Sequence, residues 1–264
     1  MSKRTLKVRS NGLDFHCEMR GAGPAVVLIP DGSNDCEPYD ALASRLAEQF
    51  TTLTFDMRGS ARSPDPEPGP VTPAMLADDV AGLIAALDLE PAGIYGCSSG
   101  GQAALALGKH HPRRVRNIVV HEAALQSDSP LPGAGFEYFR YLMSFAPHLG
   151  DGITPMDILS GNAEAVSAVS TACRERIEAN ARFWSQYYLG SVDGDRYLAE
   201  DFQAMPPVRF TVGAWSPAWL VYANLETARR GDCDVTWFNC AHRPDLTCPD
   251  EYAAFLRHAF GADQ

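Results

Sequence analysis

The sequence has no cluster of positive charge and no long apolar segment. Lys and Arg never occur in runs longer than a pair, and the chain carries a formal net charge of -11. Because binding to phosphate groups needs clustered cations, we expect neither nucleic acid nor a membrane surface as a partner. No segment approaches the roughly 20 apolar residues of a membrane span, and residues 1–10 are not followed by the apolar region of a signal peptide. We therefore expect a cytoplasmic protein.

The chain also lacks a cysteine pattern that would indicate disulfides or a metal. Its seven cysteines are an odd number without paired spacing, unlike a disulfide framework. Cys233, Cys240 and Cys248 lie near His242 in the sequence, but they lack the close pairs typical of zinc sites. No phosphate-binding loop or dinucleotide fingerprint is present either. The sequence therefore predicts no metal and no organic cofactor.

The chain instead shows an alternation of apolar strands and helices. Residues 25–29 form an unbroken apolar run bounded by turn residues, which predicts a strand buried on both faces. Asn11 and Gly12 predict the turn of a hairpin, because both turn positions need a positive φ. The other predicted strands are 6–9, 13–17, 51–55, 92–95, 117–120, 208–212 and 235–238, and the predicted helices are 38–49, 72–87, 100–109, 174–188 and 249–260. This order predicts an α/β fold with a mainly parallel central sheet and flanking helices.

One stretch interrupts the alternation. Residues 126–206 contain no clear buried strand, and they carry Gly and Pro interruptions and scattered aromatic residues. The strand pattern resumes at residue 208. We therefore expect a helical cap, or lid, at 126–206, inserted into a core formed by 1–125 and 207–264.

Residues 96–100 read Gly-Cys-Ser-Ser-Gly, a G-x-S-x-G pattern between a predicted strand and a predicted helix. The glycines permit a sharp turn that lifts the Ser98 hydroxyl clear of the sheet, and the following helix offers free N–H groups to an anion. In this context the pattern predicts Ser98 as a nucleophile. The alternative is a turn of small residues that only packs.

A nucleophilic serine needs a base, and His242 is the best placed of the seven histidines. It follows the last predicted strand and lies far downstream of Ser98, in the chain order expected when such a serine is the nucleophile. The alternative is a loop histidine with a structural role.

The acid that should orient His242 is not where it is usually found. The loop at 213–220, after the strand 208–212, contains no carboxylate. Glu122, however, ends the strand that follows the nucleophile's helix, and ligands of open parallel sheets bind at such strand ends. We therefore predict Glu122 as the acid. The alternative is a solvated charge at a strand end, with the acid missing.

The negative oxygen formed by attack needs N–H donors that are already in place. One predicted donor is the backbone N–H of Ser99, directly after the nucleophile. The other is the backbone N–H of Gly32, in the loop after the strand 25–29, where no side chain would obstruct a substrate. The alternative for Gly32 is a routine glycine turn.

Taken together, these motifs resemble the zearalenone hydrolases, which are fungal lactonases of the α/β-hydrolase superfamily. The resemblance rests on residues 26–32 (VVLIPDG), 54–57 (TFDM), 96–100 and 121–122 (HE), and on the loop around His242. It implies an α/β-hydrolase fold, a Ser-His-Glu triad, opening of a resorcylic macrolactone and loss of carbon dioxide from the opened product. It also implies that Trp184 is the counterpart of a cap tryptophan that contacts the substrate.

The expected partner is thus a small hydrophobic lactone, and the sequence is compatible with a homodimer. Two alternatives stay open. The chain could be a carboxylesterase or lactonase for another hydrophobic ester, or a ligand receptor of the same fold with little turnover. The aromatic pairs 183–184 and 187–188 could line a pocket or pack the cap onto the core. Multiple turnover on a short chromogenic ester separates an enzyme from a receptor.

Overall fold

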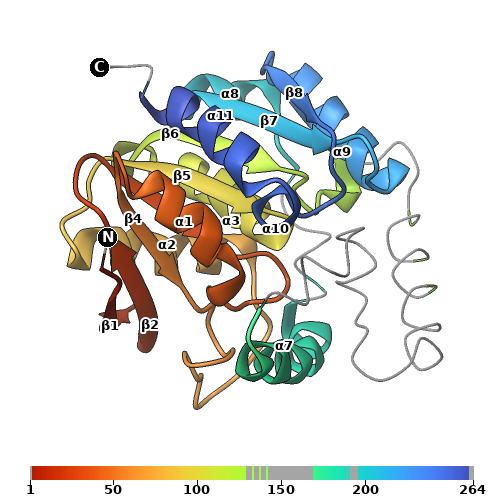
Figure 1. Ribbon diagram of the computed structural model, residues 1–264. Helices are drawn as coiled ribbons and strands as arrows, with labels where there is room; N and C mark the ends of the chain where they lie inside the picture. Colours follow the sequence, from red (N-terminus) through yellow and green to blue (C-terminus); the bar gives the residue numbers. More distant parts are fainter. Residues whose placement is uncertain are drawn as a thin grey trace.

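The computed structural model describes residues 2–128, 133, 137, 141, 169–188, 190 and 196–261. Its centre is an eight-stranded sheet with the order β1-β2-β4-β3-β5-β6-β7-β8 (Figure 1). The strands are β1 (Arg4–Ser10), β2 (Leu13–Arg20), β3 (Ala25–Ile29), β4 (Thr51–Phe55), β5 (Ala92–Cys97), β6 (Val115–His121), β7 (Val208–Gly213) and β8 (Val235–Phe238). β1 and β2 are antiparallel to their neighbours, and β3 to β8 run parallel. The predicted fold class is therefore confirmed.

Helices cover both faces of this sheet. The α-helices are α1 (Asp40–Leu46), α2 (Pro73–Ala86), α3 (Ser99–His110), α7 (Thr171–Phe183), α8 (Ala199–Ala204), α9 (Ala218–Arg230), α10 (Pro244–Thr247) and α11 (Pro249–Gly261). Figure 1 shows α1 and α11 side by side on one face, with α2 and α3 on the other.

The core is divided between the two faces because side chains alternate along each strand. In β3 all five residues are buried. Val26 and Leu28 pack with residues of α1 and α11, whereas Val27 and Ile29 pack with residues of α2 and α3. The unbroken apolar run at 25–29 therefore reflects a strand buried on both faces, as predicted.

Most elements predicted from periodicity are present. The hairpin turn has φ values of 38° at Asn11 and 84° at Gly12, and Thr72 caps α2 by accepting a hydrogen bond from the N–H of Met75. The helices α9 and α10 were not predicted. Among the described residues, no helix combines the length and the apolar character that crossing a membrane requires.

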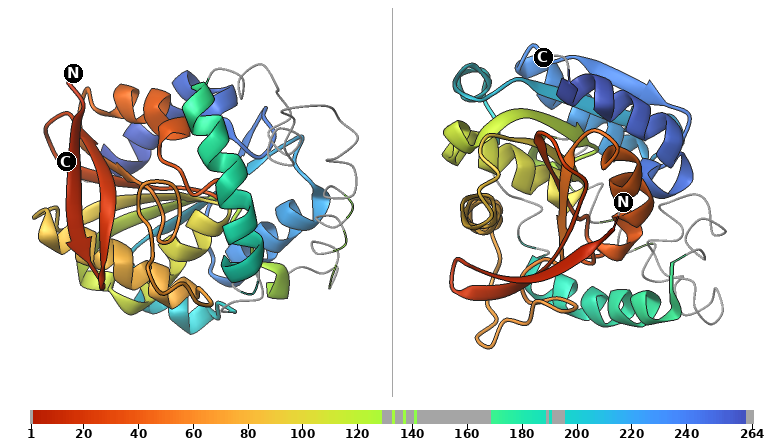
Figure 2. Two further views of the ribbon diagram at one scale, coloured as in Figure 1. Left: turned by 90° about the horizontal axis from the view of Figure 1, so that it is seen from below. Right: turned by 60° about the vertical axis from the view of Figure 1, so that its left-hand side comes forward.

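The predicted cap at 126–206 lies largely outside the described residues, so its boundaries stay a prediction. The regular elements described within it are a short 3-10 turn (Gln126–Asp128), α7, a π-helical turn (Trp184–Tyr188) and α8. In Figures 1 and 2, α7 stands outside the two helical layers that cover the sheet. This position places it against loops of the core rather than against a sheet face.

Candidate active site

Ser98 lies at a sharp turn between β5 and α3. Its backbone has φ 55° and ψ -121°, a strained conformation for a residue with a side chain. A Cβ on Gly96 would stand 2.2 Å from the carbonyl oxygen of Gly100, and a Cβ on Gly100 would stand 2.4 Å from that of Ile29. Only glycine fits at these two positions. The turn leaves Ser98 partly exposed, while its neighbours on either side are buried.

His242 and Glu122 lie in direct contact. The Nδ1 atom of His242 is 2.7 Å from Oε2 of Glu122, and both residues are buried, with exposed fractions of 2% and 0%. Because a carboxylate can only accept, the proton lies on Nδ1 of His242. The Nε2 atom is then left to accept a proton. The structure thus brings the predicted base and the predicted acid together.

Glu122 reaches this position because the chain turns sharply where β6 ends. Its φ is 44°, and its backbone N–H donates to the carbonyl oxygen of Thr211 at 3.2 Å. Its second carboxylate oxygen, Oε1, accepts the backbone N–H of Gly213 at 2.6 Å. Gly213 ends β7, the strand whose following loop holds no carboxylate. The carboxylate from β6 therefore occupies the end of the neighbouring strand.

The electrostatics keep Glu122 charged. Burial raises the pKa of Glu122, but the positive charge that His121 takes up at low pH and the hydrogen bond from His242 outweigh it, so the net pKa is lowered. His121 is also fully buried, and burial lowers its pKa to about 4, so it is neutral at neutral pH. One buried negative charge thus lies beside His242, where it stabilises a positive charge on the imidazole when one forms.

The turn that carries Gly32 lies beside Trp184. Gly32 is partly exposed, and a Cβ there would stand 3.2 Å from Nε1 of Trp184, so the indole packs over this turn. Ser99 is the first residue of α3, and its N–H belongs to those that a helix leaves without an acceptor inside the helix. Both predicted donors therefore lie on turns that suit the role.

Polar contacts attach α7 to the loops around this turn. The side-chain amide of Asn180 donates to the carbonyl oxygen of Ser33 at 2.8 Å, and its oxygen accepts the N–H of Ala61 at 2.8 Å. Arg176 donates to Asp35 at 2.5 Å. Because the π-helical turn follows α7 directly, these contacts hold Trp184 beside Gly32.

The other aromatic residues of this segment have structural contacts. Tyr188 is fully buried, and its hydroxyl donates to the carbonyl oxygen of Arg58 at 2.8 Å. The rings of Phe183 and Tyr187 have centroids 4.7 Å apart, and Phe183 packs over Gly59. Trp184 is thus the aromatic residue of this segment that contacts the predicted oxyanion turn.

Sequence reasoning missed a buried ionic cluster behind the site. Arg243 directly follows His242, is 1% exposed, and bonds to Asp31 and Asp245. Asp31 in turn precedes Gly32. A signal existed in the sequence, since an arginine next to a predicted base needs a partner if it is buried. Nothing in the sequence pointed to Asp31 as that partner.

Three groups of side chains in the described residues bring three ligand atoms within 4.8 Å of one another. One is the cluster of His121, Glu122 and His242, in which His242 already bonds to the carboxylate. The other two contain Cys36 and Cys173, where Arg62 lies 3.3 Å from the Cys36 sulfur and Arg176 bonds to a carboxylate next to Cys173. Guanidinium groups thus occupy the atoms a metal would need. The three cysteines near His242 in sequence form no such group in the described part of the chain.

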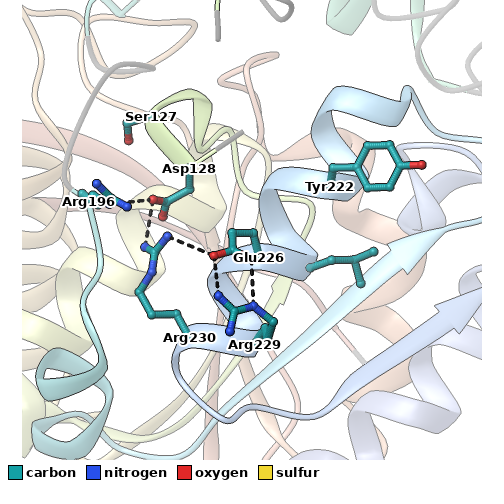
Figure 3. Close-up of a pocket in the computed structure, with 8 residues that line it drawn as sticks. Ser127, Asp128, Arg196, Tyr222, Glu226, Arg229 and Arg230 are labelled. Carbon is teal, nitrogen blue, oxygen red and sulfur yellow. Dashed lines mark hydrogen bonds and ion pairs between the residues drawn. The ribbon is translucent and has the colours of Figure 1, made fainter. Parts of the chain in front are cut away.

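A cavity of about 430 Å³ lies between α9, the 3-10 turn that ends at Asp128, and residue 196 (Figure 3). None of the predicted site residues lines it. Arg230 donates to Asp128 at 2.8 Å, Arg229 donates to Glu226 at 2.8 and 2.9 Å, and Arg196 lies 3.4 Å from Asp128. Each charged side chain of this cavity therefore has a partner of opposite sign within it, which explains the cluster as structural.

Comparisons with known proteins identify the family and the fold of the chain. The family model described as alpha/beta hydrolase fold matches residues 24–205. The chain is 29% identical to a zearalenone hydrolase of Bionectria ochroleuca over 97% of each chain. It is also 29% identical to a zearalenone hydrolase of Cladophialophora bantiana, over 96% of this chain and 95% of that one. The resemblance predicted from the motifs is thereby confirmed. Among solved structures, the enol-lactonase from Burkholderia xenovorans LB400 has the same fold, with a TM-score of 0.74 and 19% identity over 95% of this chain and 98% of that one.

Proposed function

Because the chain belongs to the α/β-hydrolase fold family and is an ester hydrolase, we propose that it opens the lactone ester of zearalenone-like resorcylic macrolactones. The observation that carries the substrate class is the similarity to two zearalenone hydrolases over nearly the whole chain. The seven free cysteines fit a reducing, cytoplasmic setting for this activity.

In the proposed reaction Ser98 attacks the lactone carbonyl while Nε2 of His242 takes its proton. The carbonyl oxygen becomes negative and accepts hydrogen bonds from the N–H groups of Gly32 and Ser99. As the tetrahedral intermediate collapses, His242 returns the proton to the leaving oxygen, and the ring opens on a serine ester. His242 then activates a water molecule that releases the free acid. By resemblance, this product then loses carbon dioxide.

Glu122 has two roles in this proposal. It holds the imidazole so that Nε2 faces the nucleophile, and its charge stabilises the imidazolium that forms after proton transfer. The 2.7 Å contact with Nδ1 of His242 supports both roles. The second contact, from the N–H of Gly213, fixes the carboxylate so that it cannot rotate away.

Trp184 is the proposed substrate-binding residue. Its indole packs over Gly32, so a substrate whose carbonyl oxygen bonds to Gly32 lies within reach of the aromatic ring. An indole offers an apolar face to a ring-containing lactone and one N–H donor for its polar groups.

The direct test is chromatography of zearalenone after incubation with the purified protein. The proposal expects disappearance of zearalenone, a ring-opened product and many turnovers per protein molecule. Hydrolysis of a short chromogenic ester without any loss of zearalenone would contradict the substrate class and leave a general esterase. A single covalent event followed by no further reaction would indicate a receptor.

A further inference from the structure

We propose that Arg243 is a positioning residue for the oxyanion turn, an inference that rests on the proposed ester hydrolysis. Its guanidinium group joins the loop that carries His242 to the turn that carries Gly32. Its positive charge also offsets the negative charge of Asp31, which precedes the proposed oxyanion donor.

The contacts of Arg243 span both loops. Its Nε and Nη2 atoms donate to the carboxylate of Asp245 at 3.0 and 2.6 Å, which fixes the guanidinium plane. Its Nη1 atom donates to Oδ2 of Asp31 at 2.9 Å. The guanidinium carbon also lies 5.3 Å from the ring centre of Tyr39, in cation–π range. Arg243 is therefore held in one orientation.

Asp31 passes this constraint to the oxyanion turn. Its Oδ1 atom accepts the hydroxyl of Ser33 at 2.6 Å, and its own N–H donates to the hydroxyl of Tyr39 at 2.9 Å. Asp31 and Ser33 flank Gly32 and are 0% and 1% exposed. The direction of the Gly32 N–H is thus set by two buried neighbours that Arg243 holds in place.

Charge gives Arg243 a second effect on the reaction. Asp31 precedes the proposed donor Gly32, and a buried carboxylate without a partner repels a nearby oxyanion strongly because little water screens it. The Arg243 guanidinium, bonded to Asp31 at 2.9 Å, opposes this repulsion with its positive charge. Asp245 carries an equal charge, but it lies on the His242 loop and not on the oxyanion turn.

If the cluster is purely structural, it stabilises the fold without affecting the reaction. Two double variants distinguish this possibility from an effect on the oxyanion. Arg243→Gln with Asp31→Asn and Arg243→Gln with Asp245→Asn leave the same net charge and bury the same kinds of side chain. Only the first removes the charge beside Gly32. If the cluster acts on the oxyanion, the first double variant is the faster enzyme.

The experiment measures two reactions whose reagents have no lactone ring. They are hydrolysis of a short chromogenic ester and the rate at which a fluorophosphonate modifies Ser98, followed by intact mass. We expect Arg243→Gln to lower kcat and the modification rate roughly 10- to 100-fold with little change in KM. The Asp31→Asn double variant should exceed the Asp245→Asn double variant by roughly tenfold in both rates. If Arg243→Gln does not fold, the comparison is made between the two double variants alone.

Arg20→Gln is the matched control. Arg20 is also buried, and it pairs with Asp40 at 2.6 Å outside the candidate site. This variant should lower Tm and leave both rates unchanged. Equal rates for the two double variants, or an equal loss in Arg20→Gln, would overturn the positioning role. If the fluorophosphonate modifies the wild-type protein at the expected rate but zearalenone is not hydrolysed, only the proposed substrate is contradicted. A wild-type protein that the fluorophosphonate leaves unmodified would overturn both.

Discussion

At the scale of single residues, the candidate site depends on side chains held by more than one contact. Glu122 accepts hydrogen bonds at both carboxylate oxygens, one from His242 and one from Gly213. Ser98, by contrast, is positioned through its backbone, whose N–H donates to the carbonyl oxygen of His121 at 3.0 Å. Substitutions that keep the side-chain shape therefore separate chemistry from folding at these positions.

Ser98→Ala should abolish turnover while the fold and substrate binding persist, because only the attacking oxygen is lost. We expect kcat to fall by roughly 10⁴-fold or more, as for removal of other triad nucleophiles. The measurement is ester hydrolysis by purified variant protein, with Ser127→Ala, on the wall of the charged cavity, as the control. Retention of more than a few per cent of activity would show that another residue attacks.

Glu122→Gln should slow catalysis by roughly 10³- to 10⁴-fold. The amide can donate to Nδ1 of His242, which favours the imidazole form with its proton on Nε2, and this form cannot accept the proton of Ser98. The same kinetic assay measures the effect. Glu18→Gln serves as control, since Glu18 is also a buried glutamate, 2% exposed, and lies outside the site. A comparable kcat for Glu122→Gln and wild type would mean that a different group orients His242.

The sequence offers Ser98, His242 and Glu122 as candidates because each belongs to a local pattern. Ser98 lies in a pentapeptide, His242 follows the last strand, and Glu122 ends a strand while 213–220 lacks an acid. The bond between Arg243 and Asp31 joins residues 212 positions apart. Such a contact follows from the tertiary fold and leaves no spacing that could be recognised in one sequence.

At the scale of elements, α7 and the π-helical turn after it determine what lies over the turn that carries Gly32. Phe183 fills the space over Gly59, and Asn180 bonds to Ser33 and Ala61. These contacts fix the end of α7, so Trp184, the next residue along the chain, lies beside Gly32.

Trp184→Ala should therefore impair zearalenone hydrolysis more than hydrolysis of a short ester. Loss of a large aromatic wall should lower kcat/KM for zearalenone by roughly 10- to 100-fold, whereas a short ester gains little from that wall. The ratio of the two kcat/KM values is the measurement. Trp215→Ala is the control, because Trp215 is 73% exposed. Equal losses on both substrates together with a lower Tm would mean that Trp184 only packs the cap.

The helix α9 shows why one element escaped prediction. Two of its six buried residues, Asn224 and Thr227, are polar, and two more are only alanine. Asn224 bonds to the backbone of Ala123, which explains why it is buried. Because hydrophobic periodicity is the main signal for a helix, buried polar residues of this kind hide it.

At the scale of the whole molecule, the parallel sheet brings the ends of β3, β5, β6 and β8 to one edge. The turn with Gly32 follows β3, Ser98 follows β5, Glu122 follows β6, and His242 lies beyond β8. The alternation of strands and helices predicted this arrangement in outline. The strand order was not predictable, since it depends on which crossovers pack best and not on any single segment.

The buried histidine His121 links this site to the stability of the whole chain. Burial lowers its pKa from 6.5 to about 4, so between these values the unfolded chain binds a proton that the folded protein does not. Stability therefore falls as the pH decreases from 6.5 towards 4. Between pH 6.5 and pH 4, this difference in proton binding lowers the free energy of unfolding by about 3 kcal/mol.

His121→Gln should remove this part of the pH dependence, because glutamine binds no proton in either state. Urea unfolding at pH 7.5 and at pH 4.5 measures the free energy of unfolding under both conditions. We expect the wild type to lose more stability than the variant over this interval, by about 2 to 3 kcal/mol. The lowered pKa of Glu122 adds a further loss below pH 4.5 in the wild type, and His121 contributes to that lowering, so the comparison goes no lower than pH 4.5. His258→Gln, at an exposed position on α11, should keep the wild-type profile. An identical pH dependence in His121→Gln and wild type would show that His121 is already protonated in the folded protein, with its charge balanced by Glu122.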